Sequence, residues 1–411
     1  MNKVSKKTSE SENKLSRRRF VAEAGMATAS WMMLQPALVR GTQANARIKT
    51  GVIGLGGRGA WIARHLREHG GYEITAVADY FDEVVQEVGA ELGVAQERRF
   101  SGLNGYKRLV DSQVEAVFCE TPPYCFPDHV AEAVTAGCHV YVAKPLGCDV
   151  PGCLKIAAAA KQATANKQVF LCDFQTRTNE YYIEAVKRVQ RGDIGAFTLL
   201  DVPGGSNGFK DPPLTDTIES RLRHLVWVND VALGGGLNVN FDIHAVDVAL
   251  WIAGKRPVSA MGCARRADTT AHGDAMRVFS LTYQFDGGLV LNQRTDHLQN
   301  LTSDIVCNAY GDKGYLESKY NGKVWIQSHK EPYRGGETGG IYQKGMQANV
   351  ATFHRSVTQK NYDNPTVEPS INSTLATILG REAGRRNTEL TWDAMIKENR
   401  RWEPNLRGLK A

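Results

Sequence analysis

The fold is decided by a short apolar run that leads into a glycine-rich turn, Thr50-Gly51-Val52-Ile53-Gly54-Leu55-Gly56-Gly57-Arg58-Gly59. The apolar run predicts a buried strand, and the residues after the turn place small apolar side chains at helical spacing. A second apolar run, residues 74–78, ends at Asp79, twenty residues after Gly59. A strand, spaced glycines, a helix and an acidic residue in this order are the context of a dinucleotide-binding fingerprint.

Each glycine of this turn has a predicted role. Gly54 permits the tight turn, Gly56 lets a diphosphate approach the backbone, and Gly59 lets the helix pack against the strand. The N–H groups that open the helix around Gly57 have no partners within the helix. They are expected to bind the phosphates of a dinucleotide.

Asp79 and Arg58 bear on which nucleotide binds. Asp79 is predicted to accept hydrogen bonds from the hydroxyls of the adenosine ribose. Its negative charge repels a 2′-phosphate, so the sequence favours NAD over NADP. Arg58 leaves NADP as an alternative, because a guanidinium can bind such a phosphate.

The body of the chain divides into two predicted α/β parts. Apolar runs expected to be strands alternate with helical stretches up to about residue 174, which is typical of a parallel sheet covered on both faces. The expected strands are residues 49–53, 74–78, 114–119, 139–142 and 169–172. The expected helices are residues 59–68, 83–92, 128–136 and 152–164.

After a helix over residues 180–191, strand candidates follow one another, with Asp286-Gly287-Gly288 as a hairpin turn between two of them. These strands are residues 197–202, 258–264, 278–285, 289–295, 304–309 and 324–327, and helices return over 346–358 and 373–385. The sequence thus predicts a Rossmann domain over residues 47–174 and a substrate and oligomerisation domain with an open, largely antiparallel sheet over 175–390. Residues 391–411 are expected to form a tail.

Residues 1–46 have the order of an export leader. They contain eight Lys and Arg and three Glu, out of 50 basic and 44 acidic residues in the whole chain, so the rest is almost neutral. Ser16-Arg17-Arg18-Arg19-Phe20-Val21 precedes an uncharged run, residues 24–34, and Ala44-Asn45-Ala46 offers a cleavage site. This resembles a bacterial twin-arginine signal, which implies export of the folded protein by the twin-arginine translocase to the periplasm or beyond.

The charge distribution and the spacing of the cysteines argue against nucleic-acid binding and against a metal site. An almost neutral body gives no electrostatic case for nucleic-acid binding. The eight cysteines form no C-x-x-C pair, and no histidine stands at zinc-finger spacing, so no metal site is predicted.

Candidate catalytic residues stand where predicted parallel strands end. Thr121-Pro122 follows one such strand, with His129 on the next helix, and Lys144 follows another. Ligands of such sheets bind beyond the carboxyl ends of the strands, so these residues are expected to line the cofactor site. Gln175 and Arg177 follow a further strand and are expected to face the substrate, although a structural salt bridge is an equal alternative for Arg177.

A second group of candidates is Asn240, Asp242 and His244. One helical turn separates Asn240 from His244, so both side chains are expected to face one site. His244 is a candidate general acid or base, and Asn240 is expected to orient a substrate hydroxyl. Asp242 would point elsewhere on a regular helix and could take part in catalysis only where the backbone is irregular.

In these motifs the chain resembles the Gfo/Idh/MocA superfamily. The resemblance is carried by Gly54–Gly59, Thr121-Pro122 with His129, Gly137-x-His139-Val140 before Lys144-Pro145, Phe174-Gln175-x-Arg177, Gly192-Asp193-Ile194-Gly195, residues 234–247 and Gly311-Asp312-Lys313-Gly314. It implies a Rossmann domain, a second domain whose open sheet often forms dimers, and sugar or polyol substrates. It also implies that Lys144 lies near the nicotinamide and the reacting hydroxyl.

The sequence departs from the family pattern at two positions. Ala143 replaces the glutamate that usually precedes Lys144, and Asn240 replaces an aspartate four residues before His244. Three functions therefore stay open. The first is NAD-dependent oxidation of a sugar or polyol, in which Lys144 or His244 accepts the hydroxyl proton. The second is redox-neutral cleavage of a glycoside by a hydrolase or lyase that retains its NAD, and the third is non-catalytic nucleotide binding.

Overall fold

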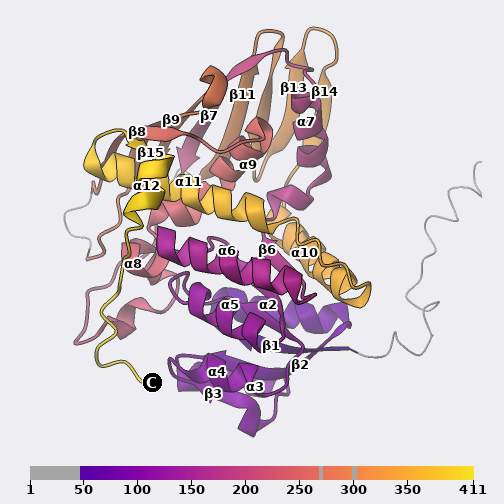
Figure 1. Cartoon of the computed structure of the whole chain (residues 1–411), viewed down its shortest axis with the longest axis vertical. Coiled ribbons are helices and arrows are strands. Elements are labelled where there is room, and N and C mark those ends of the chain that lie inside the picture. The colour runs from indigo at the N-terminus through magenta and orange to yellow at the C-terminus, as the bar shows by residue number, and fades with distance from the viewer. Residues whose placement is uncertain (1–46, 268–271, 299–302) are drawn as a thin grey trace, which may run out of the picture. The chain divides into compact units, whose positions relative to one another are not determined.

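The apolar runs of the first half form a six-stranded parallel sheet. The strands are β1 (Ile48–Ile53), β2 (Tyr72–Asp79), β3 (Arg99–Ser101), β4 (Ala116–Cys119), β5 (His139–Ala143) and β6 (Phe170–Asp173). Their order across the sheet is β3-β2-β1-β4-β5-β6, with every neighbouring pair parallel. Figure 1 shows this sheet in indigo and magenta, in the lower part of the view. The order reverses direction at β1, which places a ligand crevice at the carboxyl ends of β1 and β4.

The structure, a computed structural model, describes residues 47–267, 272–298 and 303–411. The predicted twin-arginine leader, residues 1–46, lies outside the described residues. The parallel sheet is accompanied by α2 (Gly57–His69), α3 (Asp82–Glu91), α4 (Gly105–Val110), α5 (Phe126–Thr135) and α6 (Val150–Ala165), with a short turn η2 (Gln96–Arg98). The predicted Rossmann fold is confirmed. Sequence patterning missed β3 and α4, because three and six residues are too short to show a period.

A nine-stranded sheet makes up the second half. Its strands are β7 (Phe197–Gly205), β8 (Ser259–Arg265), β9 (Val278–Gln284), β10 (Val290–Asp296), β11 (Asp304–Gly311), β12 (Gly314–Lys319), β13 (Lys323–Ser328), β14 (Tyr333–Glu337) and β15 (Leu390–Thr391). Their order is β14-β13-β12-β11-β7-β10-β9-β8-β15. The pairing of β7 with β10 is parallel, and the others are antiparallel, which confirms the largely antiparallel prediction.

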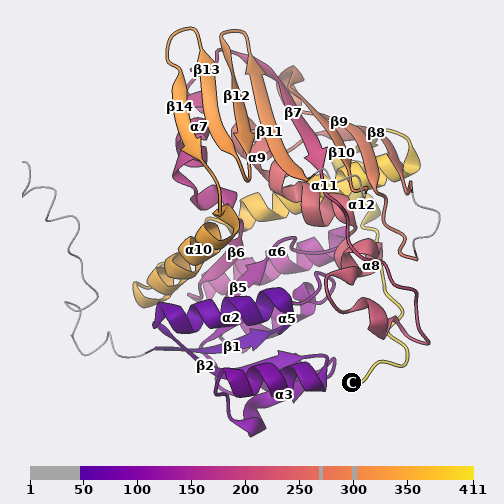
Figure 2. The same ribbon diagram turned by 180° about the vertical axis from the view of Figure 1, so that it is seen from behind.

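Helices gather on one face of the nine-stranded sheet. The helices of this half are α7 (Glu180–Gln190), α8 (Val231–Gly234), α9 (Ile243–Ala253), α10 (Ile341–Thr358), α11 (Val367–Arg386) and α12 (Trp392–Glu398). The short turns are η3 (Thr176–Thr178), η4 (Ile218–Arg221), η5 (Val226–Asn229), η6 (Asn238–Asp242) and η7 (Asp286–Gly288). Figure 2 shows α11 between the two sheets, and it packs against α6 as well as β8 and β9.

The helix α10 returns from the second half to the parallel sheet. Its Phe353 packs edge-on against Phe118 of β4 and Tyr141 of β5, with ring centroids 5.4 Å and 5.8 Å away. All three rings are buried, and each buried aromatic side chain contributes about 2–3 kcal/mol to folding. A segment more than 160 residues downstream of β6 thus completes the face of the dinucleotide sheet that α2 covers.

The last residues do not form a free tail. After α12 the chain runs on as an extended segment, residues 399–411, which we call the C-terminal strap. The carbonyl of Lys410 accepts a hydrogen bond of 3.0 Å from the backbone N–H of Leu103. The chain end therefore lies beside the loop between β3 and α4 (Figure 1).

Two features are absent from residues 47–267, 272–298 and 303–411. Within them no helix has both the length and the apolar character to cross a membrane. The same residues contain no cluster of three or more His, Cys, Asp or Glu side chains suited to hold a metal ion. All eight cysteines are unpaired.

Candidate active site

The glycine turn between β1 and α2 leaves room for an anionic ligand. α2 begins at Gly57 with Gly56 before it, no side chain caps its first N–H groups, and its first turn holds no acidic residue. A Cβ at Gly56 or Gly57 would meet no atom within 4 Å, so the space in front of the helix is open. Gly54 has a φ of 90°, and a Cβ there would lie 2.7 Å from the backbone of Glu120. The turn therefore fits a diphosphate bound by free amides.

Asp79, the last residue of β2, is held against this turn. Its carboxylate oxygens accept hydrogen bonds from the backbone N–H of Leu55 at 2.7 Å and of Phe81 at 3.0 Å. Burial raises the pKa of Asp79, and these N–H groups oppose the rise. The structure thus places an acidic residue beside the glycine turn, where the ribose contact is expected.

Arg58 faces away from Asp79. Its guanidinium forms an ion pair of 3.0 Å with Glu120 and a second with Asp173. These carboxylates stand at the ends of β4 and β6, on the opposite side of β1 from β2. Arg58 is therefore not placed to receive a 2′-phosphate next to Asp79, which corrects the role that left NADP as an alternative.

The loop after β4 carries Thr121 and Pro122, with His129 packed behind it. Thr121 Oγ1 lies 3.3 Å from His129 Nδ1, and the His129 ring lies 4.2 Å from that of Tyr106. Burial lowers the pKa of His129 to about 4, so its imidazole is neutral at physiological pH. In this arrangement His129 holds Thr121 in position, and its ring does not face an open ligand site.

Lys144 follows β5 and contacts the second half of the chain. Its Nζ donates a hydrogen bond of 2.6 Å to the main-chain carbonyl of Asn240. Burial, together with the positive charge of Arg58, lowers the pKa of Lys144 to about 7. A lysine with this pKa exchanges a proton near neutral pH.

Asn240 and His244 meet at Lys144. Both side chains are buried, and Asn240 Nδ2 and His244 Nδ1 make no hydrogen bond. The ring of His244 lies 5.1 Å from that of Tyr320. Burial and the positive charges of Lys144 and Arg58 lower the pKa of His244, so the ring is neutral.

Asp242 turns away from this group. The turn η6 is a π-helix, so the backbone has the irregularity that a catalytic Asp242 required. However, Asp242 Oδ2 accepts hydrogen bonds from Thr295 at 2.8 Å and Gln293 at 2.9 Å, and Oδ1 lies 3.2 Å from His297 Nε2. The carboxylate therefore ties η6 to the nine-stranded sheet, and the catalytic role considered for it does not fit the geometry.

The two residues predicted to face the substrate, Gln175 and Arg177, lie in different surroundings. Gln175 Oε1 accepts a hydrogen bond of 3.2 Å from Tyr320, whose ring contacts His244, so Gln175 supports the site through that tyrosine. Arg177 forms a two-pronged ion pair with Asp247, at 2.9 Å for each arm. It lines a separate cavity of about 700 Å³ bounded by α6, α9 and α11. For Arg177 the structure shows the salt bridge and not a place beside Lys144.

Sequence reasoning did not single out two buried carboxyl groups of the site, Glu120 and Asp173. Asp173 Oδ1 accepts a hydrogen bond of 2.7 Å from Asn349 of α10. Burial raises the pKa of Glu120 to about 7, against the opposing charge of Arg58. A signal was present, because Glu120 directly follows a buried strand and Asp173 ends one.

The site has unused hydrogen-bonding capacity. Among the described residues, the buried atoms without a hydrogen-bond partner include Arg58 Nη1, Glu120 Oε1, Asn240 Nδ2 and His244 Nδ1. Buried polar atoms are normally paired in folded proteins. Their grouping around Lys144, at the same sheet edge as the glycine turn, fits the polar end of a bound dinucleotide and a polar substrate.

Family models match both halves of the chain. Residues 48–171 match a model described as an oxidoreductase family with an NAD-binding Rossmann fold, and residues 182–317 match the Gfo/Idh/MocA C-terminal domain. The chain belongs to the Gfo/Idh/MocA oxidoreductase family. As a member of this NAD(P)-dependent enzyme family it has an NAD-binding Rossmann domain, and the glycine turn before α2 lies within the matched residues.

Individual relatives of this family member are distant. Inositol 2-dehydrogenase of Rhizobium meliloti is 22% identical over 228 residues, which cover 56% of this chain and 62% of the relative. 2,7-Anhydro-N-acetylneuraminate hydratase of Escherichia coli is 25% identical over 244 residues, 59% of each chain. The chain thus spans about three fifths of the length of these relatives.

One solved structure illustrates the shared fold. Aldose-aldose oxidoreductase from Caulobacter crescentus, in complex with glycerol, superimposes with a TM-score of 0.67 at 19% identity. The superposition covers 84% of this chain and 100% of that one. At this identity the similarity supports the two-domain fold.

Proposed function

We propose that this Gfo/Idh/MocA member oxidises a hydroxyl of a sugar or polyol, with Lys144 as the general base. The observation that carries the proposal is a half-buried lysine, bonded to the Asn240 carbonyl and with its pKa lowered to about 7, set among buried side chains that have unpaired hydrogen-bonding atoms. When bound, NAD supplies the acceptor for the hydride. Inositol, named for the Rhizobium meliloti relative, is a polyol, which supports this substrate class.

The side chains around Lys144 divide the work. Lys144 Nζ takes the proton of the reacting hydroxyl as the carbinol carbon loses its hydride. Asn240 Nδ2 donates a hydrogen bond to a neighbouring hydroxyl but carries no proton away, and neutral His244 offers Nδ1 to the same substrate. Because these groups are buried, the substrate is held in a site with little water, where positioning lowers the barrier.

Incubation with NAD and a panel of sugars and polyols tests the proposal. We expect reduced nicotinamide to accumulate with at least one substrate, and the reverse reaction to proceed with the matching ketone. Absence of both reactions across the panel, in protein that binds NAD, would contradict it.

The proposal extends to location and assembly. The order of residues 1–46 supports export in the folded state, and Arg17→Lys/Arg18→Lys should keep the protein in the cytoplasm while the wild type reaches the periplasm.

The sheet face opposite α7, α9 and α11 is the proposed surface for a homo-oligomer. Light scattering of the purified protein tests this part, and a monomer would contradict it.

A second candidate function is favoured by the C-terminal strap. Lys410 N donates a hydrogen bond of 3.2 Å to the Tyr80 hydroxyl, which in turn donates one of 2.8 Å to Glu219. Arg223 stacks on the ring of Phe81 at 3.6 Å. Tyr80 and Phe81 directly follow Asp79, so the strap and the η4 region cover the edge where the adenosine ribose is expected. Such a cover supports a cofactor that stays bound between turnovers.

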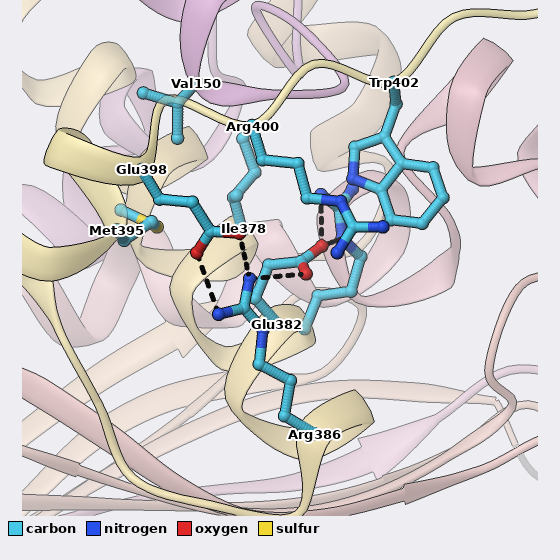
Figure 3. Close-up of a pocket in the computed structure, with 9 residues that line it drawn as sticks. Val150, Ile378, Glu382, Arg386, Met395, Glu398, Arg400 and Trp402 are labelled. Atoms are coloured by element: carbon cyan, nitrogen blue, oxygen red, sulfur yellow. Dashed lines mark hydrogen bonds and ion pairs between the residues drawn. The ribbon is translucent and has the colours of Figure 1, made fainter.

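The strap is anchored some distance from that edge. Trp402 donates its backbone N–H to Asp149 Oδ2 at 2.8 Å, and Arg400 lies over its ring at 4.4 Å. Figure 3 shows Trp402 and Arg400 beside the ion pairs that join Arg386 to Glu382 and Glu398. Arg381 and Arg385 of α11 also lie over the Trp402 ring, at 5.8 Å and 5.2 Å, so the strap is held against α11 and the start of α6.

A retained cofactor suits redox-neutral chemistry. Oxidation of a sugar carbon acidifies the adjacent C–H, elimination breaks the glycosidic bond, and return of the hydride restores the starting oxidation state. Release of an aryl leaving group from a glycoside without added NAD tests this function. No release by protein that carries NAD, as shown by mass spectrometry of the extracted cofactor, would contradict it.

A further inference from the structure

Three adjoining strand ends place Glu120, Ala143 and Asp173 in one row. β4 and β5 pair in parallel with Cys119 beside Val142, so the next residues, Glu120 and Ala143, continue the alignment. β5 and β6 pair with Ala143 beside Asp173. Neighbours in register on a parallel sheet point to the same face. The two carboxyl groups therefore flank the methyl group of Ala143.

Arg58 spans this row. Its Nε binds Glu120 Oε2 at 3.0 Å, and its Nη2 binds Asp173. Neither carboxyl group is exposed. The guanidinium thus pairs with both carboxyl groups, and Ala143 stands between them in the row. Ala143, the residue before Lys144, thus carries no charge. The carboxyl groups of Glu120 and Asp173 lie on either side of it instead.

The charges of this buried group balance in two ways. With Lys144 as ammonium and Glu120 as carboxylate, the four groups Arg58, Lys144, Glu120 and Asp173 sum to zero. With Lys144 as free amine and Glu120 as carboxylic acid, they again sum to zero, and Lys144 is ready to accept a proton. Burial brings the pKa of both Lys144 and Glu120 to about 7, so the two arrangements are close in free energy.

We propose that Glu120 is a positioning residue whose charge, together with that of Asp173, sets the protonation state of Lys144. In the proposed reaction the hydroxyl proton ends on Lys144, and the carboxylate of Glu120 stabilises the ammonium group that forms. The effect on turnover rests on the proposed function, whereas the effect on Lys144 itself does not. The other charged and titratable groups that face this pair are Arg58 of α2, Tyr141 of β5, Asp173 of β6 and His244 of α9.

A titration of Lys144 without substrate tests the inference. In full-length protein with 13C-labelled lysine, the signal of Lys144 is assigned by its loss in Lys144→Met and followed against pH. Glu120→Gln removes the negative charge, so we expect the midpoint to fall by about one pH unit. Glu120→Asp should keep the wild-type midpoint, and Glu132→Gln, on the exposed face of α5, should leave it unchanged. An unchanged or higher midpoint in Glu120→Gln would overturn the inference.

A double variant separates charge from packing. Glu120→Gln/Ala143→Glu returns a carboxylate to the middle of the row, and we expect it to restore at least half of the shift of the Lys144 midpoint. If Glu120 served only packing, Glu120→Gln would lower the melting temperature without moving the midpoint, which also overturns the inference. If no substrate is turned over yet the midpoint moves, the inference stands and the proposed function fails.

Discussion

Lys144 Nζ donates a hydrogen bond of 2.6 Å to the main-chain carbonyl oxygen of Asn240. Lys144 directly follows strand β5 of the dinucleotide domain, and Asn240 stands in the π-turn η6 of the other half of the chain. One N–H of the lysine is used by this bond, so the lone pair of the neutral amine stays available to a substrate hydroxyl. The bond thus orients the proposed base between the edge of the sheet that carries the glycine turn and the unpaired Nδ1 of His244.

Replacing Lys144 should stop the chemistry without releasing the cofactor. We expect Lys144→Met to lower kcat by about 10²–10⁴-fold, the range for loss of a general base, because no other group at that position accepts the proton. Calorimetry should give the variant nearly wild-type affinity for NAD. Lys161→Met, which changes an exposed lysine of α6, is the matched control. Turnover by Lys144→Met at the wild-type rate would contradict the role.

The pH dependence of turnover should report the same lysine. The pKa of Lys144 is lowered to about 7, so its base form predominates above that pH and its ammonium form below it. We therefore expect kcat/KM to rise with pH through about 7 and then level off. The measurement is a pH–rate profile of the wild type with saturating NAD. A rise only near the ordinary lysine value of about 10.4 would show that the buried state of Lys144 is not the reacting one.

Asp242 should matter for stability and not for chemistry. Asp242→Ala leaves Gln293, Thr295 and His297 without their shared acceptor, so we expect a loss of about 3–5 kcal/mol in the free energy of unfolding. The folded variant should keep kcat within a few-fold of the wild type. Asn240→Ala is the converse control, with lower kcat/KM and little loss of stability, because its amide nitrogen has no partner to lose. Urea unfolding and steady-state rates check both, and a stable but inactive Asp242→Ala would refute this assignment.

Asp79 should decide between the two nucleotides. Asp79→Ser removes the negative charge at the end of β2, so we expect about tenfold weaker binding of NAD and a gain for NADP. Calorimetry with both nucleotides measures the ratio. Asp111→Ser, an exposed change at the end of α4, should leave the ratio as in the wild type. An unchanged ratio in Asp79→Ser would mean that the adenosine ribose binds elsewhere.

The C-terminal strap should slow the loss of NAD. A chain that ends at Asn399 lacks the contacts of Lys410 with Leu103 and Tyr80, so we expect it to lose bound NAD about tenfold faster on dialysis. Trp402→Ala, which removes the ring beneath Arg400, should have a smaller effect of the same sign. Thermal unfolding of the cofactor-free forms controls for folding. Equal retention by the truncated and full chains would contradict a cover function.

Local patterns predicted the nucleotide-binding part well. The glycine turn and Asp79 lie within thirty residues, so chain order alone places them together. The hairpin of β9 and β10 was predicted equally well, because Asp286-Gly287-Gly288 joins two runs in which apolar and polar residues alternate. In each of these places neighbours in space are also neighbours in sequence.

The remaining parts depend on contacts that sequence order hides. The row of Glu120, Ala143 and Asp173 exists only through the register of three strands, so the two acids gave no joint signal. The orientation of Asp242 follows from the π-turn η6, which a helical wheel does not represent. Residues 399–411 have no period at all, and their path is set by single hydrogen bonds.

Transfer of deuterium decides whether this site oxidises a carbinol carbon. NAD-loaded protein is mixed with sugars and polyols, myo-inositol among them, that carry deuterium at their carbinol carbons, and the cofactor is analysed by mass spectrometry after one turnover. We expect one deuterium on the nicotinamide ring with at least one substrate in the wild type, and about a hundredth of that amount or less with Lys144→Met in the same time. Deuterium-free cofactor from the wild type across the whole panel, or equal transfer in Lys144→Met, would contradict hydride transfer assisted by this lysine.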